Sequence, residues 1–164
     1  MKIIKISQKS PYYKDVMRMI RDFFMEEHLR CGGSCETFDL SIEQIENNLE
    51  KAVPKVSIII GLKDSKLAGY ALFSTRNFCA VLGKVSMAVE DWYIKPEFRG
   101  HFFSDFIKYL ARVCVKKGYH RIEWWVNDSN VKLVNAYKHY GAEIGGQIGI
   151  DMFMDWERIL ELAK

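Results

Sequence analysis

One segment near the middle of the chain constrains the fold more than any other. An apolar strand, predicted over residues 84–94, runs into Pro96, which cannot donate to a strand ladder and so marks the end of the strand. An Arg99-Gly100 turn follows, and then an amphipathic helix predicted over residues 104–117. The first N–H groups of a helix point outward, so a strand, a tight turn and a helix N-terminus in this order form a cradle for a phosphate-bearing ligand.

Hydrophobic periodicity and turn signals predict the remaining elements. Ser10 is expected to cap a first helix that has Pro11 in its first turn, and Ser41 with Gln44 forms a capping box for a second helix. Further strands are expected at residues 3–6, 56–62, 67–75, 122–126, 142–144 and 148–154, and further helices at 130–140 and 156–163. This order predicts an α/β fold of the α+β type: a single domain over residues 1–164, with a mixed, mostly antiparallel sheet of about seven strands and helices on both faces.

Composition and charge narrow the function. The 164 residues, 49% hydrophobic and 27% charged, suit one globular domain. Residues 22–50 hold eight acidic residues against Arg30, a net −7, which leaves +10 for the rest of a chain whose total is +3. An acidic segment in an otherwise basic chain would suit a protein that binds a cationic substrate and an anionic cofactor. The alternative is that these acidic residues simply lie on solvated helix faces. No basic stripe with interleaved aromatic residues indicates a nucleic-acid partner.

Other sequence signals place limits on location and metal binding. The N-terminus lacks the features of a signal peptide, and no apolar run approaches the ~20 residues that span a membrane. Four scattered cysteines suit a reducing compartment, so a cytoplasmic protein is expected. His28, Cys31 and Cys35 come near a metal-ligand spacing, but no fourth ligand is evident and no metal is expected.

Three motifs in the right order resemble those of the GCN5-related N-acetyltransferases (the GNAT superfamily), above all the diamine (spermidine/spermine-type) enzymes. They are Glu90-Asp91-Trp92-Tyr93, Arg99-Gly100, and a helix with Asn130 followed by Tyr137-Lys138-His139-Tyr140-Gly141-Ala142. The element order matches over about residues 3–155, with the motif-bearing core at 84–155. The resemblance implies the acyl-CoA N-acyltransferase fold, acetyl-CoA as co-substrate and a small cationic amine as acceptor. Dimers are common in that family, which suggests a homodimer.

The resemblance also implies roles for individual residues. Glu90 would take a proton from the amine, directly or through water, and Asp91 would bind a distal cation or be structural. Because neighbouring strand residues point to opposite faces, at most one of the two is expected to face the substrate. Tyr137 would protonate the leaving thiolate. Substrate contacts would come from Glu26, Glu27, Glu90 and Asp91, and coenzyme A contacts from Trp92, Tyr93, Ile94, Arg99, Gly100, His101, Phe102, Phe103, Ser104, Asp105, Asn130 and Tyr137.

The coenzyme A loop departs from the family pattern. Phe102 and Ser104 stand where Arg/Gln-x-x-Gly-x-Gly/Ala has two small residues, which let the backbone approach phosphate. Phe102 is expected to weaken or re-seat coenzyme A, or to abolish its binding. Phe103 fits the apolar stripe of the following helix and Phe102 does not.

Alternatives remain open for these residues. The carboxylates could pair with nearby lysines at a strand end, and Tyr137 could be a core residue. Trp124 and Trp125 could line the cleft, with at least one of them in the core. The whole chain could be a degenerate family member that binds a ligand or partner without catalysis, or an aminoglycoside-type acetyltransferase.

Overall fold

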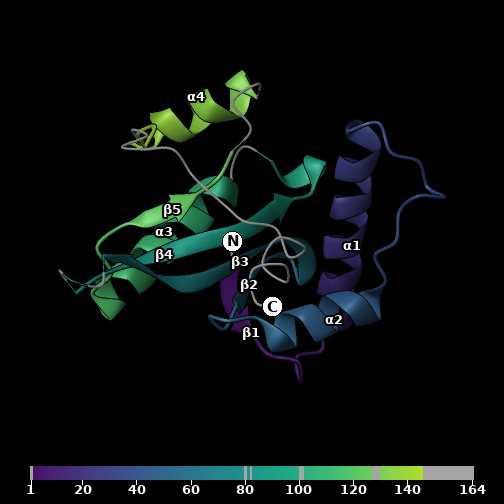
Figure 1. Ribbon diagram of the computed structural model, residues 1–164, viewed down its shortest axis with the longest axis horizontal. Helices are drawn as coiled ribbons and strands as arrows, with labels where there is room; N and C mark the ends of the chain where they lie inside the picture. Colours follow the sequence, from purple (N-terminus) through teal and green to yellow (C-terminus); the bar gives the residue numbers. More distant parts are fainter. Residues whose placement is uncertain (1, 80, 82, 100–101, 127–129, 146–164) are drawn as a thin grey trace, which may run out of the picture. The chain divides into compact units, whose positions relative to one another are not determined.

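The computed structural model describes residues 2–79, 81, 83–99, 102–126 and 130–145 (Figure 1). The chain divides into two compact units, residues 1–125 and 126–164. The first unit holds the sheet and three α-helices, and the second holds one further helix within its described residues.

One sheet organises the first unit. Its five described strands follow each other in chain order, β1-β2-β3-β4-β5. All neighbouring pairs are antiparallel except β4 and β5, which are parallel. The mixed, mostly antiparallel sheet is therefore confirmed, with these bounds: β1 Lys2–Ile6, β2 Ser57–Lys63, β3 Lys66–Cys79, β4 Lys84–Ile94 and β5 Ile122–Trp124.

Helices cover both faces of this sheet, as predicted. Buried residues of α1 (Tyr13–Arg30) and α2 (Ile42–Lys51) share a core cluster with Ile58, Ile60 and Tyr70. Buried residues of α3 (Phe102–Lys117) share the other cluster with Ile59 and Ala71. Because successive strand residues point to opposite faces, these two sets define an α1 face and an α3 face of the sheet.

The two predicted helix caps have different outcomes. The capping box at Ser41 is confirmed, with the Gln44 N–H donating to Ser41 Oγ at 3.1 Å and the Ser41 N–H donating to Gln44 Oε1 at 2.5 Å. The prediction that Ser10 caps α1 is wrong, since the helix begins at Tyr13 with Tyr12 at its N-cap. Ser10 instead belongs to the preceding turn, where its N–H donates to the Ser7 carbonyl.

The apolar stripe of α3 is rotated from its predicted phase. The helix begins at Phe102, two residues before the predicted start, and its buried line is Phe102, Phe106, Leu110 and Cys114. Phe102 is 5% exposed and its ring packs against Phe98 at 5.2 Å, whereas Phe103, expected on the stripe, is only partly buried. The expectation that Phe102 lies off the stripe is therefore wrong. It anchors the N-terminal turn of the helix, and four-residue spacing keeps one side of a helix buried.

The second unit contains α4 (Val131–His139). Asn130 is its N-cap and accepts a hydrogen bond from the Leu133 N–H at 3.3 Å. Gly141, with φ at 83°, follows the helix as predicted. The strand predicted at 142–144 is absent from these described residues. The strand predicted at 148–154 and the helix predicted at 156–163 lie outside them. None of the described helices has the length and hydropathy required to cross a membrane.

Candidate functional site

A β-bulge places both predicted carboxylates on one face of the sheet. In the β3–β4 register Phe73 faces Val89 and Leu72 faces Asp91, so Glu90 is an extra residue on β4. The bulge interrupts the alternation of side chains between the two faces. Val89 belongs to the α3-face core, while the partner of Asp91, Leu72, belongs to the α1-face core. Glu90 and Asp91 therefore both project toward the α1 face, and the expectation that they point to opposite faces is wrong.

Two hydroxyl groups of β3 hold these carboxylates. Tyr70 Oη donates to Asp91 Oδ2 at 2.5 Å, and Ser74 Oγ donates to Glu90 Oε1. Tyr70 and Ser74 are four residues apart on one strand, so their side chains project to the same face. Tyr70 and Ser74 are both buried, so packing fixes the two hydroxyl groups and thereby the carboxylates of Asp91 and Glu90 that they bind. The sequence prediction missed these supports, although pairing the two strands in register would have indicated them.

Burial changes the acidity of Asp91. Burial raises the pKa of this carboxyl to about 6. The Tyr70 hydroxyl and the Trp92 N–H both donate hydrogen bonds to it, which lowers the pKa, but the effect of burial is larger. The nearby Glu27 carboxylate raises the pKa further. A carboxylate with a pKa of about 6 is matched to accepting a proton near neutral pH.

Helix α1 brings more negative charge to the same face. Phe23 of α1 packs on Tyr93 with ring centroids 5.3 Å apart, which brings the helix to the end of β4. Burial raises the pKa of the Tyr93 hydroxyl, and the Glu26 carboxylate raises it further. Glu26 lies close enough to act on Tyr93, and Glu27 on Asp91, so the four predicted substrate contacts gather on this face: Glu26, Glu27, Glu90 and Asp91.

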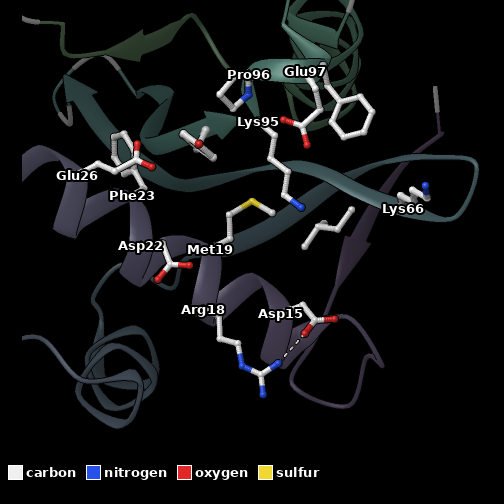
Figure 2. A pocket seen from close by; sticks show the side chains of 13 residues that line it. Asp15, Arg18, Met19, Asp22, Phe23, Glu26, Lys66, Lys95, Pro96 and Glu97 are labelled. Atoms are coloured by element: carbon white, nitrogen blue, oxygen red, sulfur yellow. Dashed lines mark hydrogen bonds and ion pairs between the residues drawn. The ribbon is translucent and has the colours of Figure 1, made fainter.

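A cavity of about 700 Å³ opens beside these groups (Figure 2). Its walls are one side of α1, the start of β3, the end of β4 and the 3-10 helix Pro96–Phe98. Glu26 and Tyr93 line it, so the cavity continues the carboxylate-bearing face beyond the end of β4. Lys95 also lines it and was not expected there.

Strands β4 and β5 separate next to the carboxylates. Their described pairing ends at Val89 opposite Trp124, although β4 continues to Ile94. The Lys95 N–H donates to the Ala68 carbonyl at 3.0 Å, and N–H directions alternate along a strand, so the N–H groups of Trp92 and Ile94 point away from β3. The Trp92 N–H donates to the Asp91 carboxylate. The Ile94 N–H is therefore the donor best placed to serve a ligand between the separated strands.

The region after β4 supplies groups suited to an anion. Arg99 Nε donates to the Ile94 carbonyl at 3.0 Å, and its guanidinium lies 5.8 Å from the centre of the Tyr93 ring. A guanidinium has five N–H donors, so most of them are left for other partners. The first turn of α3, with Phe103, Ser104 and Asp105, presents outward N–H groups that favour a phosphate, although the Asp105 charge opposes one. Gly100 and His101 lie outside the described residues.

The ring of Phe102 is buried at the start of α3. It packs into the core against Phe98, while Trp92 contacts Phe103 at 4.9 Å and Trp124 at 5.6 Å. Trp124 packs on the α3-face core and Trp125 is 82% exposed, as expected for a pair with one core member. Residues present in the first unit thus fit an elongated anionic ligand that enters where β4 and β5 separate.

Asn130 and Tyr137 lie in the second unit. Asn130 caps α4 and the Tyr137 side chain is buried. Their roles toward coenzyme A therefore stay predictions, as do those of Gly100 and His101.

Comparison with known proteins identifies the family. The model of the acetyltransferase (GNAT) family matches residues 15–142, which is most of the chain. The chain belongs to this family. The resemblance in sequence and the expected fold are thereby confirmed, and the expected enzyme class is that of the family.

Two relatives in sequence are named for amine acetylation. The chain is 33% identical to L-ornithine N5-acetyltransferase of Arabidopsis thaliana over 107 residues, 65% of this chain and 43% of that protein. It is 30% identical to thialysine N-epsilon-acetyltransferase of Mus musculus over 143 residues, 79% of this chain and 77% of that protein. The chain thus spans less than half of the plant relative.

Solved structures support the fold. An integron cassette protein of V. cholerae superposes with a TM-score of 0.70 at 18% identity, covering 99% of this chain and 97% of that one. An aminoglycoside acetyltransferase from a soil metagenome, in complex with sisomicin, gives a TM-score of 0.68 at 11% identity and covers 93% and 95% of the two chains. At these identities the likeness concerns the fold alone.

Proposed function

We propose that this protein transfers the acetyl group of acetyl-CoA to a primary amine of a small cationic substrate, by direct attack of the amine on the thioester. The observation that carries the proposal is the pair of carboxylates, Glu90 and Asp91, on one face beside the point where β4 and β5 separate. The two curated relatives are named for the acetylation of ornithine and thialysine, both small amines.

The amine must lose a proton before it attacks. An alkyl ammonium has a pKa near 10.4, so only about one molecule in a thousand is neutral at pH 7. Asp91 suits the role of proton acceptor better than Glu90, because burial raises its pKa to about 6, while Glu90 is exposed and bound by Ser74. Glu90 and Glu27 would then bind the substrate cation. The family resemblance implied the reverse, with Glu90 as the proton acceptor and Asp91 as the residue that binds the cation.

The amine nitrogen forms a bond to the thioester carbonyl carbon, and the carbon–sulfur bond breaks. Negative charge on the carbonyl oxygen would be stabilised by the Ile94 N–H, a donor fixed in place before the reaction. Asp91 would accept the ammonium proton before the attack and pass it to water, and the second amine proton, released as the carbon–nitrogen bond forms, would follow the same route. The sulfur would leave as a thiolate and take the Tyr137 hydroxyl proton, which water then returns to Tyr137.

The same residues argue for coenzyme A binding rather than for a degenerate binding protein. The bulky Phe102 in the coenzyme A loop was the reason to consider a degenerate binding protein. Its ring, however, lies in the core, and its N–H stays in the first turn of α3. Arg99 and this turn would bind the diphosphate. Calorimetry with acetyl-CoA tests the point, since micromolar binding supports the enzyme and absence of binding supports the degenerate protein.

The activity itself is tested by incubating the protein with acetyl-CoA and an amine panel while following thiol release. We expect turnover with diamines, polyamines or diamino acids, and silence across all of these and the aminoglycosides would remove the proposal. Tyr137→Phe should lower kcat by about 100-fold or more with acetyl-CoA affinity unchanged, because it removes only the acidic proton. Tyr140→Phe, on an exposed tyrosine that follows the same helix, is the matched control. Equal rates in the two variants would strip Tyr137 of this role.

A further inference from the structure

The proposed proton acceptor, Asp91, is bound by a tyrosine that lies wholly in the core. Tyr70 is 0% exposed, and its hydroxyl donates to Asp91 Oδ2 at 2.5 Å. In the register of β3 with β4, Tyr70 lies opposite Tyr93, two residues along the strand from Asp91. It therefore reaches the carboxylate along the diagonal between neighbouring pairs, a distance that a long aromatic side chain can span.

Packing fixes the ring of Tyr70. The residue belongs to the core cluster on the α1 face and lies opposite Ile60 of β2. Its ring centroid is 6.3 Å from that of Tyr93, and the Tyr93 ring packs in turn on Phe23 of α1 at 5.3 Å. A side chain locked in this way holds its hydroxyl at one place, which is what a group that orients a reacting residue requires.

The hydroxyl of Tyr70 is not needed to fill this space. A phenylalanine ring would occupy nearly the same volume, and burial of a hydroxyl costs free energy unless the group is hydrogen-bonded. Burial raises the pKa of Tyr70, and the Asp91 carboxylate raises it further, so the hydroxyl stays protonated at neutral pH. Tyr70 therefore serves Asp91 as a donor and does not itself accept the proton of a substrate.

Groups on α1, β3 and β4 act on the Asp91 carboxylate. Tyr70 and the Trp92 N–H donate hydrogen bonds to it and lower its pKa, while the Glu27 carboxylate raises it. The adjacent carboxylate, Glu90, has a separate donor on β3. Of the two donors to Asp91, Tyr70 is the side chain and can be removed by substitution. Because a hydrogen bond to the ionised form favours that form, its loss would raise the pKa of Asp91.

We propose that Tyr70 is a positioning residue for the acetyl transfer: its hydroxyl orients the Asp91 carboxylate and keeps it ionised, ready to accept the proton of the amine. The inference rests on the proposed acetyltransferase function, with Asp91 as the proton acceptor. Since its own side chain is fully buried, Tyr70 acts through Asp91 and not on the substrate itself.

Tyr70→Phe tests the proposal through the pH profile of kcat/KM. The variant loses one hydrogen bond to a charged group, which should raise the acid limb set by Asp91 by about one to two pH units. Ionisation of the amine is common to both proteins, so the ratio of variant to wild-type kcat/KM isolates this limb. We expect the ratio to rise by about 10- to 100-fold between pH 5 and pH 9. A ratio that is the same at every pH would make Tyr70 a structural residue and overturn the proposal.

Tyr13→Phe is the matched control. Tyr13 is a buried tyrosine of the same core cluster, and its hydroxyl is hydrogen-bonded to Gln8, so this variant should leave the acid limb in place. Replacement of Tyr70 by 3-fluorotyrosine keeps the hydroxyl and makes it a stronger donor, and should move the limb toward lower pH. This second change also serves if Tyr70→Phe does not fold. A limb that moves upward with both changes at Tyr70 would reflect disturbed packing and overturn the proposal.

Carboxyl NMR provides a readout that does not depend on turnover. In protein labelled with carbon-13 aspartate, the resonance of Asp91, assigned by its loss in Asp91→Asn, should titrate about one to two pH units higher in Tyr70→Phe than in the wild type. An unchanged titration, or a shifted titration without a shifted acid limb, overturns the role of Tyr70 in the transfer. If the resonance shifts and no amine is ever acetylated, the acetyltransferase proposal fails while the control of Asp91 by Tyr70 stands.

Discussion

Replacing Asp91 by asparagine should stabilise the protein at alkaline pH, although it removes the proposed proton acceptor. Burial raises the folded-state pKa of Asp91 from 3.8 to about 6. This is about two pKa units, and each unit corresponds to about 1.4 kcal/mol, so an ionised Asp91 costs roughly 3 kcal/mol of folding free energy. Asparagine has nearly the same shape and can accept the Tyr70 hydrogen bond without carrying a charge.

The sign of the pH dependence follows from the direction of the shift. Between pH 3.8 and about 6 the folded state holds this proton more tightly than the unfolded chain, so the contribution of Asp91 to stability falls as pH rises through that window. Below pH 3.8 the carboxyl is protonated in both states and the cost vanishes. Above pH 6 the full cost applies. The stability of the variant relative to the wild type should therefore rise by about 3 kcal/mol between pH 4 and pH 8. Burial of the amide shifts the values at both pH equally and leaves this rise unchanged.

Urea unfolding of both proteins at pH 4, 5, 6, 7 and 8 measures this difference directly. Other titrating groups cancel because they are common to both proteins. Asp39→Asn, on an exposed loop, is the control for the loss of a carboxylate from the surface. An Asp91→Asn variant that is less stable than the wild type at pH 8, or a stability difference that does not vary with pH, would refute the reasoning. Acetylation by the same variant should fall sharply, so that stability and activity move in opposite directions.

Two further substitutions test the frame around the site. Phe102→Ala should lower the free energy of unfolding by about 3 to 5 kcal/mol, because it empties a buried position against Phe98, and acetyl-CoA should bind the folded variant no more tightly than the wild type. Tighter binding would mean that the ring obstructs the phosphates after all. Gly69→Ala should reduce both stability and kcat, because its Cβ would lie 2.4 Å from the Tyr93 carbonyl oxygen and push the end of β4 away. Gly145→Ala, where a Cβ meets nothing within 4 Å, is the control, and equal activity of the two variants would show that the position of β4 does not matter.

Much of the site could be recognised from local sequence. The strand at 84–94 was predicted with its observed bounds, and the capping box at Ser41 was predicted with both of its hydrogen bonds. These features depend on residues close together in the chain. The phase of α3 was mistaken because Phe102 and Phe103 are adjacent and equally apolar, and in the folded protein Phe102 is buried against Phe98 while Phe103 is only partly buried.

The sequence by itself determined the order of the elements from β1 to α4, the family and the residues from which a site could be built, because periodicity, capping and short motifs are local properties of the chain. Tertiary structure decided how those residues meet. The bulge at Glu90 exists only in the pairing of β4 with β3, and it turns two neighbouring carboxylates to the same face. The raised pKa of Asp91 depends on burial, and the cavity beside the end of β4 depends on the packing of α1 against the sheet. Register, burial and enclosed space arise between segments distant in sequence, and no local pattern encodes them.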